Sequence, residues 1–281
     1  MSGFSDRINR RTFVKYLGAT AVACPTCMAA ANAMASETKK TEGHDASAGE
    51  KKSSHGSSHW GYEGTEGPEN WGELSPQYSV CGRGYEQSPI NLTKAISSAV
   101  GGIDVNYKRT PLRVVNNGHT IQVNCDPGST MSLRGDKFSL LQFHFHHPSE
   151  HALDGARFQM EAHFVHASSD GRLAVLGVFI EPGMENSLLA PIWRAMPMEA
   201  GPEVKIESTM IKPDDLLPAD RSYFRYMGSL TTPPCSQIVN WSVFKQPVQA
   251  SSAQVGKFSS LFSMNARPLQ PLHRRLLLRS Q

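Results

Sequence analysis

Two segments in the middle of the chain alternate polar and apolar residues with the period of a β-strand. The first is Gln142-Phe143-His144-Phe145-His146, and the second is Glu161-Ala162-His163-Phe164-Val165. Side chains at positions i and i+2 project from the same face of a strand. His144 and His146 therefore share one face, and two neighbouring strands would bring their imidazoles to His163.

Three converging imidazoles are typical of a catalytic zinc site, because they leave the fourth tetrahedral position to water, whereas structural zinc is usually closed by four protein ligands. Gln142 shares the strand face of His144, and Glu161 shares that of His163. Metal-bound imidazoles usually donate their second N–H to an oxygen acceptor, so we expect these two side chains to orient the ligands. The alternative is that the histidines lie on a solvated strand face or, for His163, in the core.

The rest of the pattern favours one large β-rich domain. Short β-branched runs are separated by turn residues, and the 281 residues include 23 glycines and 18 prolines. The formal net charge of +3 is small and belongs partly to the first forty residues, so it indicates no nucleic-acid or membrane-surface partner. No apolar run approaches the roughly 20 residues of a spanning helix, and we expect no transmembrane segment.

The N-terminus has the features of an export signal. Asn9-Arg10-Arg11-Thr12-Phe13-Val14-Lys15 resembles a twin-arginine motif, an apolar stretch follows over 16–23, and Ala33-Met34-Ala35 offers small residues for cleavage. We therefore predict a twin-arginine-type signal peptide over 1–35 and a periplasmic or secreted protein. Ala31-Asn32-Ala33 is a competing cleavage site.

Residues 36–58 offer nothing apolar to bury and are predicted to form a disordered polar linker. A lipid anchor on Cys24 is a minority alternative, since the preceding residues lack the usual leucine of a lipoprotein signal.

Cysteine usage agrees with export. Cys24 and Cys27 fall in the leader, which leaves Cys81, Cys125 and Cys235 in the mature chain. An oxidising compartment would allow the loops of Cys81 and Cys235 to be joined, but spacing alone does not choose the pair. Three buried thiols that act as small hydrophobic side chains are the alternative.

A series of further segments extends from residue 59 to the C-terminus in one order and, together with the histidines, resembles an α-class carbonic anhydrase of the exported bacterial type. The segments are Trp60-Gly61-Tyr62, Gly67-Pro68-Glu69-Asn70-Trp71, Gln87-Ser88-Pro89-Ile90-Asn91, Asn116-Asn117-Gly118-His119, Ser149-Glu150-His151, Leu173-Ala174-Val175-Leu176-Gly177, Leu230-Thr231-Thr232-Pro233-Pro234 and Asn265-Ala266-Arg267-Pro268-Leu269-Gln270-Pro271.

The resemblance implies a catalytic domain over 59–281 that is a zinc-dependent hydro-lyase (carbonate dehydratase). His144, His146 and His163 match the ligands of Zn2+, at which a zinc-bound hydroxide attacks CO2 to give bicarbonate. Water then displaces the bicarbonate and loses a proton to restore the hydroxide, so that the net products are bicarbonate and a proton. The implied partners are CO2, bicarbonate and water, and a homodimer is left open. A non-catalytic binding module of the same fold and a periplasmic zinc-scavenging protein are the competing functions.

Three further residues match catalytic positions of the family. Thr231 matches a gatekeeper whose hydroxyl donates to the carboxylate of Glu150 and so must accept from the nucleophile. His119 matches a proton shuttle that acts through ordered water. Taken singly, Thr231 would be an ordinary turn residue before a proline, and His119 would be a turn histidine.

The walls of the expected cavity also follow from the resemblance. Tyr62, Asn117 and Gln122 match its polar side, where Gln122 replaces an Asn that is common in the best-known members. On the substrate side, the resemblance implies Thr232 and an apolar wall. Each wall residue taken alone is better explained as part of the core. The wall residues are Val165, Val175, Leu230, Val239 and Trp241.

The implied fold is mainly β (α+β), a single domain built on a central, twisted, mostly antiparallel sheet of about ten strands with short surface helices. Family resemblance also implies cis peptides at Ser88-Pro89 and Pro233-Pro234, and a disulfide between Cys81 and Cys235 that leaves Cys125 free or in an intermolecular bond. His147, His151 and His166 are not expected to be ligands, because strand alternation turns His147 and His166 away from the metal face.

Overall fold

The computed structural model describes residues 59–281. The predicted signal peptide (1–35) and linker (36–58) lie outside the described residues, as do Cys24 and Cys27. Those two predictions therefore remain predictions.

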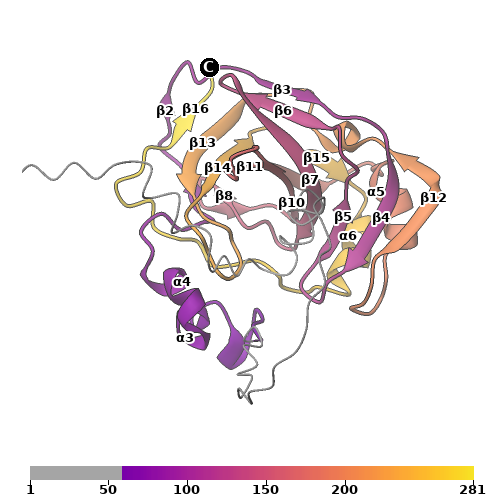
Figure 1. Ribbon diagram of the computed structural model, residues 1–281, viewed down its shortest axis with the longest axis horizontal. Coiled ribbons are helices and arrows are strands. Elements are labelled where there is room, and N and C mark those ends of the chain that lie inside the picture. Colours follow the sequence, from indigo (N-terminus) through magenta and orange to yellow (C-terminus); the bar gives the residue numbers. More distant parts are fainter. Residues whose placement is uncertain (1–58) are drawn as a thin grey trace, which may run out of the picture. The chain divides into compact units, whose positions relative to one another are not determined.

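One large mixed sheet of 13 strands dominates the described part of the chain (Figure 1). A continuous path of strands runs through it in the order β12 (Val204–Ile211), β4 (Thr110–Asn116), β5 (Ile121–Asn124), β7 (Asp136–His146), β10 (Met160–Ala167), β11 (Leu173–Pro182), β14 (Val239–Phe244), β13 (Tyr223–Gly228), β16 (Leu278–Arg279) and β2 (Ile96–Ser97). Three strands join outside the path: β15 (Val248–Ala250) pairs with β11, and β3 (Ile103–Asn106) pairs with β6 (Thr130–Leu133), which also pairs with β7.

Most neighbouring strands run antiparallel, as predicted. The parallel pairs of this sheet are β11 with β14, β11 with β15, and β16 with β2. A separate sheet of three short strands contains β1 (Asn91–Leu92), β8 (Ala152–Leu153) and β9 (Ala156–Arg157). The predicted mainly β fold is confirmed, although the large sheet has more than the ten strands expected. Strands of three or four residues, such as β3 and β15, are too short for their alternation to identify them in the sequence.

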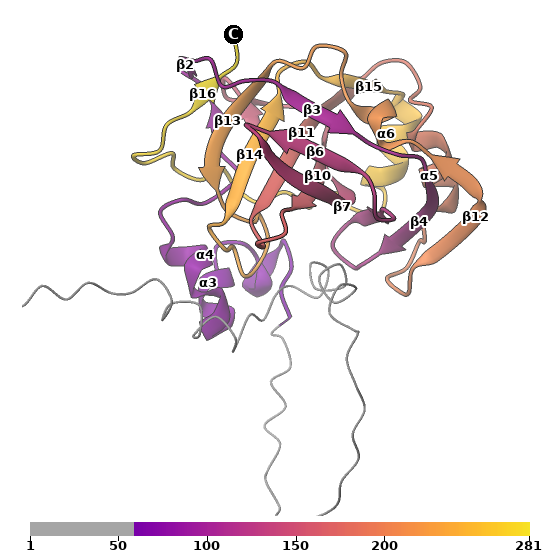
Figure 2. The same cartoon turned by 45° about the horizontal axis from the view of Figure 1, so that its top comes forward.

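Within residues 59–281 the helices are few and short. They are α3 (Trp71–Leu74), α4 (Ser79–Arg83), α5 (Leu189–Ala195) and α6 (Ser252–Ser259), with 3-10 turns η2 (Gly64–Glu66), η3 (Pro76–Tyr78) and η4 (Pro213–Leu216). Figure 2 shows α5 and α6 on a different side of the sheet from α3 and α4. No helix within residues 59–281 has the length and apolar character needed to cross a membrane.

The apolar face of the central strands forms the larger core. Phe143 and Phe145 of β7 are fully buried, and the Phe143 ring stacks on Phe164 of β10 at a centroid distance of 5.0 Å. Trp193 of α5 covers Phe145 at 4.8 Å, and Phe258 of α6 lies 5.6 Å from Trp193. This packing fixes the register of β7 and β10, because a slip of one residue would turn the phenylalanines out of the core.

The opposite face of the same strands carries a second buried cluster, which includes Val165, Val175, Phe179 and Trp241. Strands β10 and β11 are therefore buried on both faces, in keeping with their central place in the sheet. Cis peptides occur at Ser88-Pro89 and Pro233-Pro234, as expected, and also at His147-Pro148.

Candidate metal centre

Strands β7 and β10 bring the three predicted histidines together. His163 lies directly opposite His144 in the antiparallel register, and His146 follows two residues later on the same face. Ring centroids are 5.0 Å apart for His144 and His146, 5.4 Å for His144 and His163, and 4.5 Å for His146 and His163. One nitrogen from each ring lies within 4.8 Å of the others, which suits three ligands of one ion.

In each of the two imidazoles on β7, a hydrogen bond at Nδ1 fixes the orientation of the ring. Nδ1 of His144 lies 2.9 Å from Oε1 of Gln142, and Nδ1 of His146 lies 2.7 Å from the carbonyl oxygen of Asn265. Carbonyl oxygens only accept, so each Nδ1 carries the proton and each Nε2 keeps its lone pair. Nε2 of His146 is buried without a hydrogen-bond partner among the described residues, as expected of a nitrogen that binds a metal.

His163 faces the site with the other nitrogen. Its Nε2 lies 3.0 Å from Oε1 of Glu161, without the alignment of a hydrogen bond, which leaves Nδ1 toward the other two rings. Glu161 also accepts from the backbone N–H of His151 at 2.8 Å and contacts Nδ1 of His151 at 2.8 Å. Burial disfavours the charged carboxylate of Glu161, but its interactions with His151 and His163 outweigh burial and hold its pKa well below the usual value.

Gly177 of β11 makes room for this carboxylate. It pairs with His163 in the β10–β11 register, and a Cβ there would lie 2.8 Å from Oε1 of Glu161 and 3.1 Å from a methyl group of Val243. A side chain at 177 would therefore push against the residue that orients His163.

The donor set fits zinc. Burial is the main cause that lowers the pKa of His144 well below its ordinary value and also lowers the pKa of His146, so both rings are neutral ligands at neutral pH. Three imidazole nitrogens with no thiolate match an open catalytic zinc site. A second group of potential ligands among the described residues, His151 with Glu161 and His163, is less suitable, because both nitrogens of His151 already have partners. Its Nδ1 contacts Oε1 of Glu161 at 2.8 Å, and its Nε2 contacts the hydroxyl of Tyr226 at 2.6 Å.

Glu150 adds a buried carboxylate beside the imidazoles. Its Oε1 accepts from the backbone N–H of Arg267 at 2.9 Å. Its Oε2 has no hydrogen-bond partner and lies 3.5 Å from Nε2 of His146 and 3.8 Å from Nδ1 of His163. Thr231 is also buried, but the described residues show no hydrogen bond between its hydroxyl and Glu150.

His119 follows a tight turn at the end of β4. The side-chain oxygen of Asn117 accepts from the backbone N–H groups of His119 and Thr120, both at 3.0 Å. The imidazole of His119 stacks on Trp60, with centroids 3.7 Å apart and planes 7° apart. Burial, with a smaller contribution from His59, lowers the pKa of His119 to about 4.

Comparison with known proteins agrees with this geometry. A family model described as eukaryotic-type carbonic anhydrase matches residues 66–281. The chain belongs to this carbonic anhydrase family. The predicted family and enzyme class are thereby confirmed.

Individual relatives cover most of the chain. A carbonic anhydrase of Nostoc sp. is 49% identical over 224 residues, which are 78% of this chain and 85% of the relative. A carbonic anhydrase of Pectobacterium carotovorum is 42% identical over 221 residues, 78% of this chain and 90% of the relative. Among solved structures, an α-carbonic anhydrase from Thermovibrio ammonificans in complex with sulfanilamide matches with a TM-score of 0.77 and 46% identity, covering 79% of this chain and 100% of that one.

Two residues expected on the polar side of a carbonic anhydrase cavity, Gln122 and Tyr62, have defined neighbours in the structure. Gln122 of β5 pairs with His144 of β7 in the sheet register, and its Nε2 donates to Oδ1 of Asn124 at 2.6 Å. The ring of Tyr62 packs edge-on against that of Trp60, with centroids 5.6 Å apart, and Trp60 is also the ring on which His119 stacks.

The expected apolar residues are joined in the second core cluster. Trp241 lies 4.8 Å from the His163 ring, between centroids, and Val165 shares the strand face of His163. The complete set is Val165, Val175, Leu230, Val239 and Trp241. Thr232 is half-buried, and its carbonyl oxygen accepts from the backbone N–H of Cys235 at 2.9 Å.

The disulfide forms between Cys81 and Cys235, with Cys125 as the free cysteine of the described residues. His147 and His166 lie away from the metal centre: Nδ1 of His147 contacts the carbonyl oxygen of Ser263 at 3.0 Å, and Nε2 of His166 contacts the hydroxyl of Tyr107 at 2.7 Å.

Sequence reasoning missed several contacts of this centre. Strand periodicity cannot reveal that the carbonyl of Asn265 orients His146 or that the N–H of Arg267 holds Glu150, because both groups are backbone atoms of a segment without regular structure. It also missed His151 as a partner of Glu161 and Trp60 as a partner of His119. The only available signal was that all four residues lie in the segments that carry the family resemblance.

Proposed function

We propose that this chain catalyses the reversible hydration of CO2 to bicarbonate and a proton at a zinc ion held by His144, His146 and His163. The observation that supports it most is the set of three converging imidazoles, of which His146 and His163 are buried and His144 is partly buried. The outer nitrogen of each ring lies within 3.0 Å of an oxygen atom, so that one lone pair per ring faces a common point. When bound, zinc supplies a Lewis acid that makes a hydroxide nucleophile available near neutral pH, as is established for carbonic anhydrases.

Glu150 and Thr231 are proposed to orient the nucleophile. A hydroxyl group has one donor, and if Thr231 spends it on the carboxylate of Glu150 it can only accept from the attacking group. The free Oε2 of Glu150 beside the two imidazole nitrogens supports this role. The apolar cluster with Val165 and Trp241 is proposed to receive CO2, which carries no charge and gains nothing from polar contacts.

His119 is proposed to carry the product proton to solvent. Stacked on Trp60, the ring has a pKa of about 4 and holds a proton poorly at neutral pH. An imidazole in water has a pKa near 6.5 and exchanges protons with little free-energy cost. We therefore propose that His119 takes up the proton after its ring leaves Trp60 for the water-facing side.

The test compares wild-type protein with Thr231→Ala and Thr231→Ser, with the zinc content measured for each. Stopped-flow CO2 hydration should show kcat/KM at least about 10-fold lower for Thr231→Ala and near wild type for Thr231→Ser, which keeps the hydroxyl. Activity that Thr231→Ala leaves unchanged would remove Thr231 from the mechanism.

The same assay separates the competing functions. A zinc-scavenging protein would bind zinc fully and show no hydration. A non-catalytic binding module would also show no hydration and would be expected to lack one of the zinc ligands. Neither function requires a hydroxyl at Thr231 or a carboxylate at Glu150, so the buried Glu150 beside the imidazoles favours the enzyme.

We also propose that the protein is exported through a twin-arginine-type signal peptide over 1–35 to the periplasm or beyond. The disulfide between Cys81 and Cys235 supports this, because disulfides persist in oxidising compartments. Mature protein that retains its first 35 residues, as read by mass spectrometry, would contradict the proposal.

A further inference from the structure

A segment without regular secondary structure contacts the metal centre twice. Within 264–270 the chain belongs to no helix or strand. The carbonyl oxygen of Asn265 nevertheless orients His146, and the backbone N–H of Arg267 holds Oε1 of Glu150. Since no strand ladder fixes these two backbone groups, something else must hold them in place.

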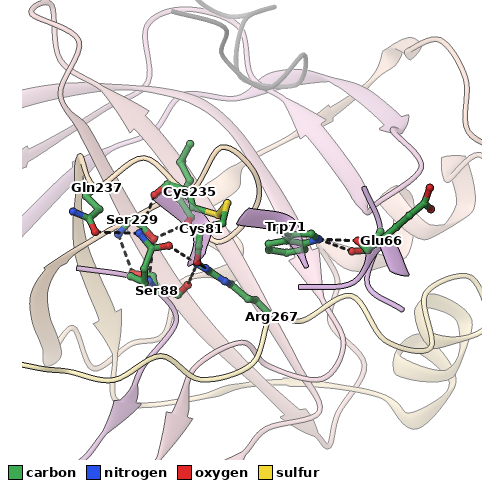
Figure 3. Close-up of a disulfide and its surroundings, with 11 residues drawn as sticks. Glu66, Trp71, Cys81, Ser88, Ser229, Cys235, Gln237 and Arg267 are labelled. Atoms are coloured by element: carbon green, nitrogen blue, oxygen red, sulfur yellow. Dashed lines mark hydrogen bonds between the residues drawn. A yellow bond between two sulfur atoms is a disulfide. The ribbon is translucent and has the colours of Figure 1, made fainter. Parts of the chain in front are cut away.

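The side chain of Arg267 supplies an anchor. It is 1% exposed, and its Nη1 donates to Oε1 of Gln87 at 2.9 Å and to the carbonyl oxygen of Ser88 at 2.8 Å. Its Nη2 donates to the carbonyl oxygen of Cys81 at 2.8 Å, and the guanidinium lies 5.6 Å from the ring of Trp71 (Figure 3). Hydrogen bonds from a charged donor contribute more than neutral ones, so three of them tie residue 267 firmly to α4 and to the segment that follows it.

Burying the Arg267 guanidinium costs desolvation free energy that a purely structural role does not require. Among residues 59–281 no carboxylate lies within ion-pair distance of the Arg267 guanidinium, and its Nε has no hydrogen-bond partner. Burial lowers the pKa of Arg267 to about 10, which reflects the free energy of desolvating the cation. Well-packed neutral side chains could join the same segments with less desolvation.

One of the residues to which Arg267 is anchored belongs to the disulfide. Cys81, whose carbonyl Arg267 binds, is bonded to Cys235, and the backbone N–H of Cys235 donates to Thr232 at 2.9 Å, next to Thr231. Both proposed gate residues, Glu150 and Thr231, are thus connected to one disulfide through short contacts.

A second arginine, Arg157, joins the backbone before Glu150 to the backbone of Arg267. Nη1 of Arg157 donates to the carbonyl oxygen of Ser149 at 3.0 Å, and its Nη2 donates to the carbonyl oxygen of Arg267 at 3.1 Å. The backbone next to Glu150 and the backbone of Arg267 are therefore held against each other.

We propose that Arg267 is a positioning residue for CO2 hydration, whose buried guanidinium fixes the backbone N–H that holds Glu150 in its working orientation. This inference rests on the proposed function. Loss of the guanidinium lets segment 264–270 shift, and Glu150 then loses its place beside the imidazole nitrogens, from which it is proposed to accept the proton of the Thr231 hydroxyl.

The kinetic test uses Arg267→Lys in the full chain, loaded with zinc. Lysine keeps the charge, but all its donors lie on one nitrogen. It therefore cannot reach all the acceptors that the two terminal nitrogens of the guanidinium bind. We expect kcat/KM for CO2 to fall about 10- to 100-fold at full zinc occupancy, with no recovery on addition of imidazole buffer. Arg172→Lys is the matched control: it disturbs the pairs with Asp136 and Asp170, two exposed carboxylates outside the metal centre, and activity should stay at the wild-type level.

A double-mutant cycle with Glu150→Gln identifies the route of the effect. If Arg267 acts through Glu150, Arg267→Lys should change kcat/KM by less than about 2-fold in the Glu150→Gln background. Equal losses in both backgrounds would overturn the proposal, and so would a lowered melting temperature with unchanged kcat/KM.

A readout independent of activity is the hydrogen exchange of the residue 267 amide in metal-free protein. This amide should exchange at least about 10-fold faster in Arg267→Lys, while amides of β10 and β11 keep their protection. Should Arg267→Lys fail to fold, Gln87→Met, which removes one acceptor and leaves Arg267 in place, should shift the same amide in the same direction. An unchanged amide would contradict the proposal, whereas a wild-type protein without hydration activity would contradict the proposed function and leave the exchange test standing.

Discussion

Each imidazole of the metal centre is oriented by an oxygen from a different kind of source. Gln142 and Glu161 come from the same strands as the histidines they contact, two residues earlier, so alternation along a strand was enough to predict them. Asn265 acts on His146 through a carbonyl group 119 residues away in sequence, and no side-chain pattern could have revealed that contact. Sequence reasoning at this scale therefore reaches partners within one strand and stops at backbone groups from distant segments.

Replacement of His119 tests the proposed shuttle. His119→Ala should lower kcat for CO2 hydration about 10-fold or more while kcat/KM stays near wild type, because proton release and CO2 conversion are separate steps. Added imidazole buffer should restore kcat by carrying the proton in place of the side chain. Equal loss in kcat and kcat/KM would exclude His119 as the shuttle.

His166 on the opposite sheet face predicts a pH dependence of stability. Burial lowers its pKa to about 4, against about 6.5 in the unfolded chain. Between these values the unfolded state binds the extra proton, so the free energy of unfolding should fall as pH falls from about 6.5 to about 4, by roughly 3 kcal/mol for this residue. Denaturant titrations of wild type and His166→Leu over this range should show a shallower pH slope in the variant. Identical slopes would contradict the assignment.

At the scale of elements, the metal centre depends on close pairing of β7, β10 and β11. His144 and His163 face each other across two of these strands, and Gly177 of the third leaves space for Glu161. The long central strands were predictable because their alternation continues over several residues. Strands of two to four residues, such as β2 and β15, and the irregular segment 264–270 follow from tertiary contacts and left no local signal.

Gly177→Ala tests the space beside Glu161. The added Cβ would lie 2.8 Å from the carboxylate oxygen, so Glu161 or β11 must move, and we expect a loss of stability of about 1–3 kcal/mol together with weaker zinc retention against a chelator. Gly256→Ala in α6 is the control, because a Cβ there meets no atom within 4 Å and alanine favours a helix. If Gly177→Ala retained zinc and stability as well as Gly256→Ala, the close approach of Glu161 to β11 would not matter for the metal centre.

At the scale of the whole molecule, the two faces of one sheet have separate tasks. One face packs Phe143, Phe145 and Phe164 into the main core, and the other carries the imidazoles and the apolar cluster with Trp241. The family resemblance was needed to assign the second face to a reaction, since each of its apolar residues is as well explained by packing. It was also needed to choose the pair Cys81 and Cys235, which lie 154 residues apart.

The central claim is that the three imidazoles hold one zinc ion that CO2 hydration requires. Metal-stripped protein is titrated with zinc while stopped-flow CO2 hydration is recorded, with His163→Ala as the control variant. The account predicts that activity rises in proportion to added zinc and saturates at about one equivalent per chain, with no comparable rise in the variant. Full binding of one zinc without hydration, or hydration that does not depend on zinc, would contradict it.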